Sequence, residues 1–409
     1  MFTGKRFGLW IRVVATLVST SMLLISRDMS LASDATSPLR STSFHIALPL
    51  HTEGRFILDS NGRRLKLAGV NWYGAEEKDH VVGGLDLADL RFIAHWIKVE
   101  GFNSVRLPWS NELYESDPLV ADSAVSANPS LKGKHAMQVL DAVIDALAAE
   151  GLVVVIDNHT STADWCCFRG DGNELWYRDS YPESAWISDW QGIVRRYLHQ
   201  PAVVAVDLRN EVRDGATWGG SDPQLDWHAA AERAANAVLS VNSNMLIVVE
   251  GVKSATDLRG VASLPVRIKV GHRLVNSPHH YSSDHGGLAS YQQLEAQLDG
   301  AWGYLSAPGK SYTAPLWLGE FGTCHLNSRC VDDTEFGSQG FWFSNLLHYL
   351  QQYDVDWCYW PLNGTQSRGT TRLFAAEETF GVMNASWKGP ALPSLLGSIQ
   401  SLQPASLSR

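Results

Sequence analysis

Short runs of apolar residues recur along the chain and alternate with longer amphipathic segments. The clearest run, 152–156, is apolar throughout and leads directly into Asp157-Asn158-His159. Runs of this length and composition are typical of parallel strands that are buried on both faces. We expect eight such strands, at 65–72, 103–107, 152–159, 203–211, 245–250, 274–277, 315–318 and 355–360.

The segments between these runs show apolar residues at spacings of three and four, which indicates helices with one buried face. Segment 87–100 has this spacing and is followed by Gly101, a common residue after a helix end. We expect helices at 87–100, 135–150, 185–197, 227–241, 336–353 and 392–402. Eight strands that alternate with helices predict an α/β fold of the (β/α)8 TIM barrel type, built as a single domain.

The first residues of the chain have the pattern of a secretory signal. Basic residues precede an apolar stretch from Val13 to Ile25, and small residues lie at Ser30 and Ala32. The apolar stretch is shorter than the roughly 20 residues of a membrane span, which favours cleavage near Ala32 over an uncleaved anchor. We therefore expect a signal peptide at 1–32, a flexible lead-in at 33–45 and the barrel at 46–409.

The segment 54–65 predicts a hairpin around the Asn61-Gly62 turn, placed so that it covers the bottom of the barrel.

Charge and composition narrow the possible partners. The chain has 33 basic and 43 acidic residues, a net charge of −10, and no basic run after the N-terminal segment. Nucleic acid is excluded as a partner because phosphate binding needs clustered Lys and Arg. Sixteen tryptophans suit sugar binding, since exposed indole faces pack against the apolar faces of sugar rings. We expect a secreted monomer, extracellular or periplasmic, with no membrane contact after signal cleavage.

The five cysteines fit no zinc spacing, and in an exported protein they favour disulfides. Cys324 and Cys330 would close the shortest convenient loop, and one thiol must remain. Cys358 lies in an apolar run and fits a small buried residue. The long loop with Cys166 and Cys167 could form a wall of the cleft that is pinned by a disulfide, although the sequence leaves the pairing open.

Two glutamates stand at the ends of predicted strands. Glu320 follows the run 315–318, and Glu211 ends the run 203–211. Their separation fits three βα units of roughly 30 to 45 residues each, so both would emerge at the C-terminal rim, where barrel active sites lie. A structural ion pair is the alternative for either acid, but two facing carboxylates are typical of a glycosidase active site.

Other strand ends add polar groups to the same rim. Arg106 lies inside a predicted strand and should meet a carboxylate, because a buried unpaired charge is costly. That bridge could be purely structural or could keep Glu320 ionised. His159 ends another strand and is either a core histidine or part of the rim.

A histidine cluster follows the strand at 274–277 and invites a metal assignment. His279, His280 and His285 lie near Asp284, but they follow one strand and lack the Cys/His framework or the helical His pair of known sites. We predict no metal and no cofactor.

Taken together, these strand-end motifs resemble glycoside hydrolase family 5, the cellulase family of clan A. The resemblance covers nearly the whole predicted mature chain, and it is closest to secreted bacterial endo-β-1,4-glucanases at 81–85, 226–250 and 302–305. The motifs that carry it are Asn71-Trp72-Tyr73-Gly74, Arg106-Leu107-Pro108, His159, Asn210-Glu211, His279-His280-Tyr281, Leu318-Gly319-Glu320-Phe321-Gly322 and Trp360.

The resemblance implies a retaining mechanism, with Glu211 as general acid/base and Glu320 as the nucleophile that forms a covalent glycosyl-enzyme. It also implies supporting roles for seven residues. Arg106 and Tyr281 would act on Glu320, Asn210 would hold the sugar 2-hydroxyl, His159 and His279 would bind substrate and tune the acid, Trp360 would be the sugar platform, and Trp72 would support or bind substrate.

Several departures from the family pattern bear on the substrate. Arg209 and Val212 replace commoner residues around Glu211, and the loop after Glu250 is short. The substrate, a β-linked polysaccharide or oligosaccharide, could thus be cellulose, mannan, mixed-linkage glucan or β-1,3-glucan, and exo-action on oligosaccharides is a further alternative.

The family's characteristic cis peptide after the last strand's Trp falls here at Trp360-Pro361, where proline makes cis inexpensive. We therefore predict a cis bond at this position.

Two non-enzymatic readings explain the sequence less well. A non-catalytic carbohydrate-binding barrel would be expected to lack one acid, whereas this chain has both Glu211 and Glu320. A structural exported protein would leave the polar strand ends unexplained.

Overall fold

The predicted strands are present, and most are shorter than expected. The computed structural model describes residues 46–168, 170–284 and 290–403. The strands are β1 (His51–Glu53), β2 (Phe56–Leu58), β3 (Ala68–Asn71), β4 (Ser104–Ser110), β5 (Val153–Thr160), β6 (Val203–Asp207), β7 (Leu246–Glu250), β8 (Leu274–Ser277), β9 (Trp317–Leu318) and β10 (Asp356–Tyr359).

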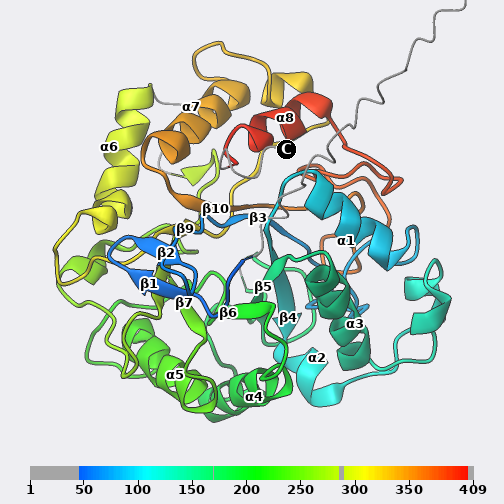
Figure 1. Cartoon of the computed structure of the whole chain (residues 1–409), viewed down its shortest axis with the longest axis horizontal. Helices are drawn as coiled ribbons and strands as arrows, with labels where there is room; N and C mark the ends of the chain where they lie inside the picture. The colour runs from blue at the N-terminus through cyan, green and yellow to red at the C-terminus, as the bar shows by residue number, and fades with distance from the viewer. Residues whose placement is uncertain (1–45, 169, 285–289, 404–409) are drawn as a thin grey trace, which may run out of the picture. The chain divides into compact units, whose positions relative to one another are not determined.

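Strands β3 to β10 form one parallel sheet in the order β8-β7-β6-β5-β4-β3-β10-β9. Parallel bridges between Asn276 and Leu316 and between His279 and Glu320 join the two ends of that order and close the sheet into a ring. Figure 1 shows the helices arranged around this ring. The predicted (β/α)8 TIM barrel is confirmed, so every barrel strand points its C-terminal end toward the same rim.

The helices also follow the prediction, with some differences. They are α1 (Leu90–Val99), α2 (Asn111–Ser116), α3 (Ala136–Ala149), α4 (Glu183–Arg196), α5 (Trp227–Val241), α6 (Tyr291–Ala301), α7 (Gln339–Gln352) and α8 (Pro393–Gln400). The sequence pattern missed α2 and α6. Strict alternation fails between β7 and β8, which are joined only by a 3₁₀ turn at Arg259–Ala262. No helix within the described ranges is long and apolar enough to cross a membrane.

Capping residues explain where the helices begin. Asp89 accepts hydrogen bonds from the backbone N–H groups of Arg91 and Phe92, and Ser338 accepts one from that of Phe341. A side-chain acceptor at this position satisfies N–H groups that have no partner within the helix. Helices α1 and α7 therefore start about one turn later than the apolar spacing alone predicts.

The hairpin β1–β2 covers the bottom of the barrel, as predicted. Its tight turn is at Gly54-Arg55 rather than at Asn61-Gly62, which instead forms a second turn closed by a bridge between Leu58 and Arg64. The hairpin's Ile57 packs in one apolar cluster with residues of the barrel interior, which include Val155, Ala205, Val248, Val275 and Cys358. The lower half of the barrel is thus apolar, which leaves the upper half for polar groups.

Candidate active site

A cleft of about 510 Å³ opens at the C-terminal ends of the strands. Most of the predicted site residues line it, namely His159, Asn210, Glu211, Tyr281, Glu320 and Trp360. Arg106 and His279 lie beneath the cleft surface, with 0% and 1% of their side chains exposed. The strand ends therefore bring together the residues that lie far apart in the sequence.

Glu320 follows β9 and is held by donors on both carboxylate oxygens. Arg106 Nη1 donates to Oε1 at 2.8 Å, and the Tyr281 hydroxyl donates to Oε2 at 2.9 Å. The preceding Gly319 leaves room for this arrangement, because a Cβ there would lie 2.6 Å from Ser277 Oγ and 3.0 Å from His279 Nε2. Glycine is needed for close approach rather than for an unusual backbone angle.

Arg106 is fully buried and meets four carboxylates. Besides Glu320, its guanidinium lies 2.9 Å from Asp207 Oδ2, 2.9 Å from Glu250 Oε1 and 3.1 Å from Asp157 Oδ1. The prediction that Arg106 pairs with a carboxylate is confirmed, although the network is larger than a single bridge. Burial raises the pKa of Asp157 to about 7 and that of Asp207 to about 6, despite the opposing effect of Arg106.

Glu211 lies four residues beyond β6 in a left-handed backbone conformation, with φ of +46°. Its backbone N–H donates to Glu250 Oε2 at 2.6 Å. Non-glycine residues rarely adopt this conformation, and when they do the surrounding contacts must hold them there. Here the buried Glu250 carboxylate provides that contact.

His279 lies between the two glutamates. Its Nδ1 is 3.0 Å from Glu211 Oε1 and 3.7 Å from Glu320 Oε2, and its Nε2 is 3.2 Å from Glu250 Oε1. Burial lowers the pKa of His279, but the charges of Glu250 and Glu320 and the hydrogen bond with Glu211 outweigh it and raise the pKa well above its usual range. One oxygen of Glu211 and one of Glu320 lie within 4.8 Å of each other.

Trp360 forms part of the cleft wall between two other rings. It stacks on His159 at 5.5 Å and on Tyr73 at 5.3 Å, with interplanar angles of 10° and 13°. His159 Nδ1 lies 2.6 Å from Asp157 Oδ2, and burial lowers the pKa of His159 to about 3, so its ring is neutral near pH 7. The predicted cis bond at Trp360-Pro361 is confirmed.

Trp72 does not reach the cleft. It is fully buried in the layer between barrel and helices, and its indole N–H donates to the carbonyl of Gly83. Its neighbour Tyr73 is the one that stacks on Trp360. The prediction that Trp72 contacts substrate is corrected, because successive side chains at a strand end point to opposite faces. Trp72 can support the site only through packing.

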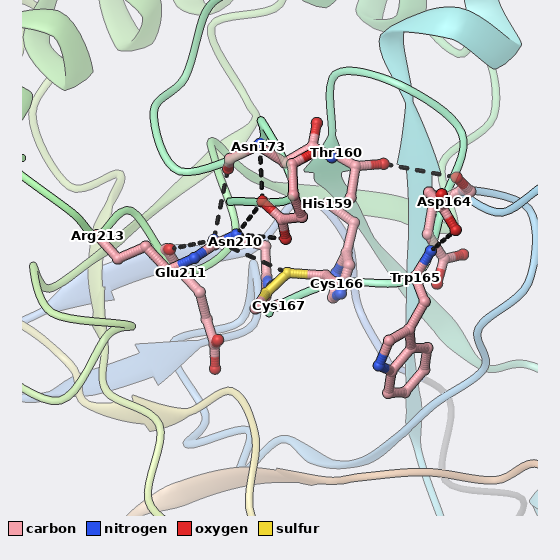
Figure 2. Close-up of a disulfide and its surroundings, with 12 residues drawn as sticks. His159, Thr160, Asp164, Trp165, Cys166, Cys167, Asn173, Asn210, Glu211 and Arg213 are labelled. Atoms are coloured by element: carbon pink, nitrogen blue, oxygen red, sulfur yellow. Dashed lines mark hydrogen bonds and ion pairs between the residues drawn. A yellow bond between two sulfur atoms is a disulfide. The ribbon is translucent and has the colours of Figure 1, made fainter. Parts of the chain in front are cut away.

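The cysteines pair in two ways. Cys324 and Cys330 form a disulfide, as the spacing predicts, and Cys358 is a buried free thiol. Cys166 and Cys167 bond to each other, so their disulfide does not pin the loop to another element. Arg213 provides that link instead, because it pairs with Asp171 of the same loop (Figure 2 shows the disulfide and its surroundings).

Some residues of the site escaped the sequence analysis. Glu250 ends β7 as Glu211 and Glu320 end their own runs, so the strand-end rule could have identified it. Asp207 likewise ends β6, and Asp157 directly follows the apolar run 152–156, so the same rule could have identified them. The loop with Cys166 and Cys167 lines the cleft, as expected, together with its neighbour Trp165, whereas Arg372, Glu378 and Phe380 are cleft-wall residues that were missed.

Two groups of acidic side chains lie close enough together to hold a metal ion, but cationic side chains of the protein already contact them. Asp157, Asp207 and Glu250 offer oxygens within 4.8 Å of one another, yet the Arg106 guanidinium contacts all three. His279 occupies the corresponding place between Glu211 and Glu320. His285, from the histidine cluster considered above, lies outside the described residues.

Comparisons with known proteins agree with this geometry. Residues 59–366 match the family model described as cellulase (glycosyl hydrolase family 5). An endoglucanase of Paenibacillus polymyxa is 33% identical over 367 residues, which cover 85% of this chain and 88% of that protein. The major extracellular endoglucanase of Xanthomonas campestris pv. campestris is 31% identical over 353 residues, covering 81% of this chain and 67% of that protein.

The solved catalytic domain of the Xanthomonas enzyme superposes with a TM-score of 0.73 at 28% identity, covering 87% of this chain and 99% of that domain. Fold, sequence and site geometry thus agree. This chain belongs to glycosyl hydrolase family 5, the cellulase family.

Proposed function

We propose that this glycoside hydrolase cleaves internal β-1,4-glucan linkages with retention of anomeric configuration. The observation that carries the proposal is the short separation, within 4.8 Å, between a carboxylate oxygen of Glu211 and one of Glu320. Retaining glycosidases place their two carboxyl groups about 5 to 5.5 Å apart, whereas inverting enzymes need about 6.5 to 9.5 Å to admit a water. The geometry therefore favours retention.

In this mechanism Glu320 attacks the anomeric carbon while Glu211 gives a proton to the departing glycosidic oxygen. The covalent glycosyl-enzyme is then hydrolysed by a water molecule, from which Glu211 takes a proton. Both residues reach the cleft from strand ends, Glu211 after β6 and Glu320 after β9, and each can lie on one side of a bound linkage. No other acid or base is required.

The two carboxyl groups have different partners, which supports different roles. Glu320 accepts hydrogen bonds from Arg106 and Tyr281, whereas Glu211 meets neither. Glu211 instead lies 3.0 Å from His279 Nδ1. Two donors directed at the Glu320 carboxylate suit the nucleophile, which leaves the acid/base role to Glu211.

Other residues would bind or position the sugar. Asn210 lines the cleft beside Glu211 and can donate to the 2-hydroxyl, an interaction that strengthens in the transition state. His159 and Trp360 supply the wall on which the sugar packs, with Trp360 only 8% exposed. Arg106 and His279 act from below the surface as positioning residues.

The polymer is inferred from the relatives named endoglucanases. One observation favours the alternative of another β-glycan or shorter oligosaccharides. The β7–β8 connection contains only a 3₁₀ turn, and its Ser254 and Thr256 line the cleft. A short connection at this edge leaves less surface for a long chain, so substrate length must be measured.

We also propose that the protein is exported and acts as a monomer. The predicted signal at 1–32 and lead-in at 33–45 lie outside the described residues. The Xanthomonas relative is named an extracellular enzyme, which supports export.

Product analysis would test the proposed activity. Purified protein would be incubated with carboxymethylcellulose, mannan, mixed-linkage glucan and cello-oligosaccharides, and the anomer formed first would be identified by proton NMR. Rapid shortening of carboxymethylcellulose and release of the β-anomer are expected. Glu320→Ala should abolish activity, whereas Glu335→Ala, at an exposed residue outside the cleft, should not. Initial release of the α-anomer would refute retention. Activity confined to another polymer would change only the proposed substrate and would leave the proposed mechanism intact.

A further inference from the structure

The disulfide between Cys166 and Cys167 joins two adjacent residues. A disulfide stabilises a fold mainly by closing a long loop in the unfolded chain. Adjacent cysteines close no such loop, since only the peptide bond between them is bridged. This disulfide therefore adds little stability by loop closure, and its role must be sought in what the sulfurs contact in the folded protein.

Both cysteines line the cleft, together with Glu211 and Trp165. Figure 2 shows the disulfide between the side chains of Glu211 and Trp165, with Asn210 directly beside the sulfurs. Cys166 is 6% exposed and Cys167 is half-buried, so the pair forms a compact apolar surface within the cleft. This surface adjoins the proposed acid/base.

The sulfurs contact the amide of Asn210. Its Nδ2 lies 3.5 Å from Cys166 Sγ and 3.5 Å from Cys167 Sγ, and its Oδ1 accepts from Arg106 Nη2 at 2.9 Å. An amide oxygen can only accept and an amide nitrogen can only donate, while guanidinium only donates and disulfide sulfur only accepts. A flipped amide would face an unsuitable partner at both ends, so this orientation is fixed.

The loop that carries the disulfide is attached to the same segment from the other side. Arg213 Nη1 donates to the carbonyl of Glu211 at 3.0 Å and lies 4.0 Å from Cys166 Sγ, and Arg213 also pairs with Asp171. Asn210 therefore contacts the loop directly through both sulfurs, and Glu211 is connected to it through Arg213. Movement of the sulfurs would therefore displace both Asn210 and Glu211.

We propose that the Cys166–Cys167 disulfide is a positioning element that holds the Asn210 amide in the orientation that presents its nitrogen, rather than its oxygen, to the cleft. This inference rests on the proposed function, in which Asn210 contacts the sugar hydroxyl in the transition state. A dithiol reductant would cleave the S–S bond to two thiols and would itself be oxidised to a disulfide. The separated thiols can rotate, and the amide then loses its fixed acceptor, so activity depends on the oxidised state.

A double-mutant cycle would test this coupling. Cys166→Ala/Cys167→Ala is expected to lower kcat about tenfold and to change KM less than about twofold, because the contact matters most in the transition state. The same pair of changes in an Asn210→Ala background should lower kcat less than about twofold further. Cys324→Ala/Cys330→Ala is the matched control, because that disulfide does not line the cleft, and its kcat should stay within about twofold of the parent.

Equal losses of kcat in both backgrounds would overturn the proposal, as would no loss in the parent. If the cysteine variant does not fold, the folded parent would be treated with dithiothreitol, with the freed thiols alkylated and located by mass spectrometry. Reduction at Cys166 and Cys167 should then lower kcat in the parent but not in Asn210→Ala, and reoxidation without alkylation should restore it. Unchanged kcat in the reduced parent would overturn the proposal.

The Glu320→Ala variant and the anomer analysis distinguish failure of the proposed function from failure of the proposed role of the disulfide. Activity that persists in Glu320→Ala would refute the proposed mechanism itself. An inactive Glu320→Ala together with an uncoupled mutant cycle would remove only the role of the disulfide.

Discussion

The backbone N–H of Glu211 donates a 2.6 Å hydrogen bond to Oε2 of Glu250. Through its other oxygen, Glu250 accepts from Arg106 at 2.9 Å and lies 3.2 Å from His279 Nε2. One buried carboxylate at the end of β7 thus fixes the backbone of the proposed acid/base and contacts both cations beneath the cleft. The two proposed catalytic glutamates are thus linked through a third, buried glutamate that does not line the cleft.

Glu250→Gln should lower kcat by about 10- to 100-fold, which corresponds to the loss of a hydrogen bond to a charged group. The amide keeps one acceptor for the Glu211 N–H but removes the negative charge between Arg106 and His279. Glu250→Ala should in addition cost about 1–3 kcal/mol of stability, because the Glu211 N–H loses its acceptor and Arg106 and His279 each lose one of their carboxylate partners. Steady-state kinetics and urea unfolding of both variants would measure these effects. A Glu250→Gln enzyme with parental kcat would show that the charge is dispensable.

Tyr281→Phe should lower kcat/KM by about 10- to 100-fold with little change in Tm. The change removes only the hydroxyl that donates to Glu320 Oε2 at 2.9 Å. Burial and the nearby Glu320 raise the pKa of Tyr281 well above its usual range, so this hydroxyl remains a donor at any working pH. Tyr353→Phe is the matched control, since it loses a hydrogen bond to Glu295 away from the cleft. Similar losses in both variants would argue against a specific role for Tyr281.

His279→Gln should be less stable than the parent, and the difference should depend on pH. Because the folded-state pKa of His279 is raised above 6.5, the charged ring contributes its full stability below pH 6.5. That contribution is lost as the pH rises through the folded-state pKa. The difference in Tm should therefore be largest at acid pH and smaller at alkaline pH. Thermal unfolding of both proteins across this range would test it, and a constant difference would mean that His279 carries no extra charge.

The barrel was predictable because buried parallel strands leave a strong pattern. Strands β6 and β7 contain only one polar residue each, and Trp227–Val241 matches its predicted helix. The start of α1 was misjudged because the cap at Asp89 overrides the apolar spacing that includes Leu87. The connection between β7 and β8 contains only a 3₁₀ turn, and none of the predicted helices falls there.

The site was predictable where it follows from strand ends alone. Glu211 and Glu320 converge because all barrel strands point toward one rim. Trp72 and Tyr73 are adjacent aromatics, and the sequence cannot show which one faces the cleft. The pairing of Cys166 with Cys167 was likewise hidden, because a contact between neighbours depends on the local backbone rather than on spacing along the chain.

Asp157→Asn should change how stability depends on pH. Asp157 is fully buried between Arg106 Nη2 at 3.1 Å and His159 Nδ1 at 2.6 Å. Burial raises its pKa from 3.8 to about 7, so between these values the folded protein binds more protons than the unfolded chain. The carboxyl of Asp157 therefore makes the parent less stable as the pH rises through this window, and the full cost remains above it.

An asparagine at position 157 keeps the shape but cannot titrate, so it removes this part of the pH dependence whatever its uniform effect on packing. The free energy of unfolding, measured with urea, should thus shift in favour of Asp157→Asn relative to the parent as the pH rises from about 4 to about 7. Asp145→Asn, at an exposed position on α3, is the matched control and should run parallel to the parent. If Asp157→Asn also ran parallel, Asp157 would be ionised throughout the window, and Arg106 would have to offset the cost of its burial completely.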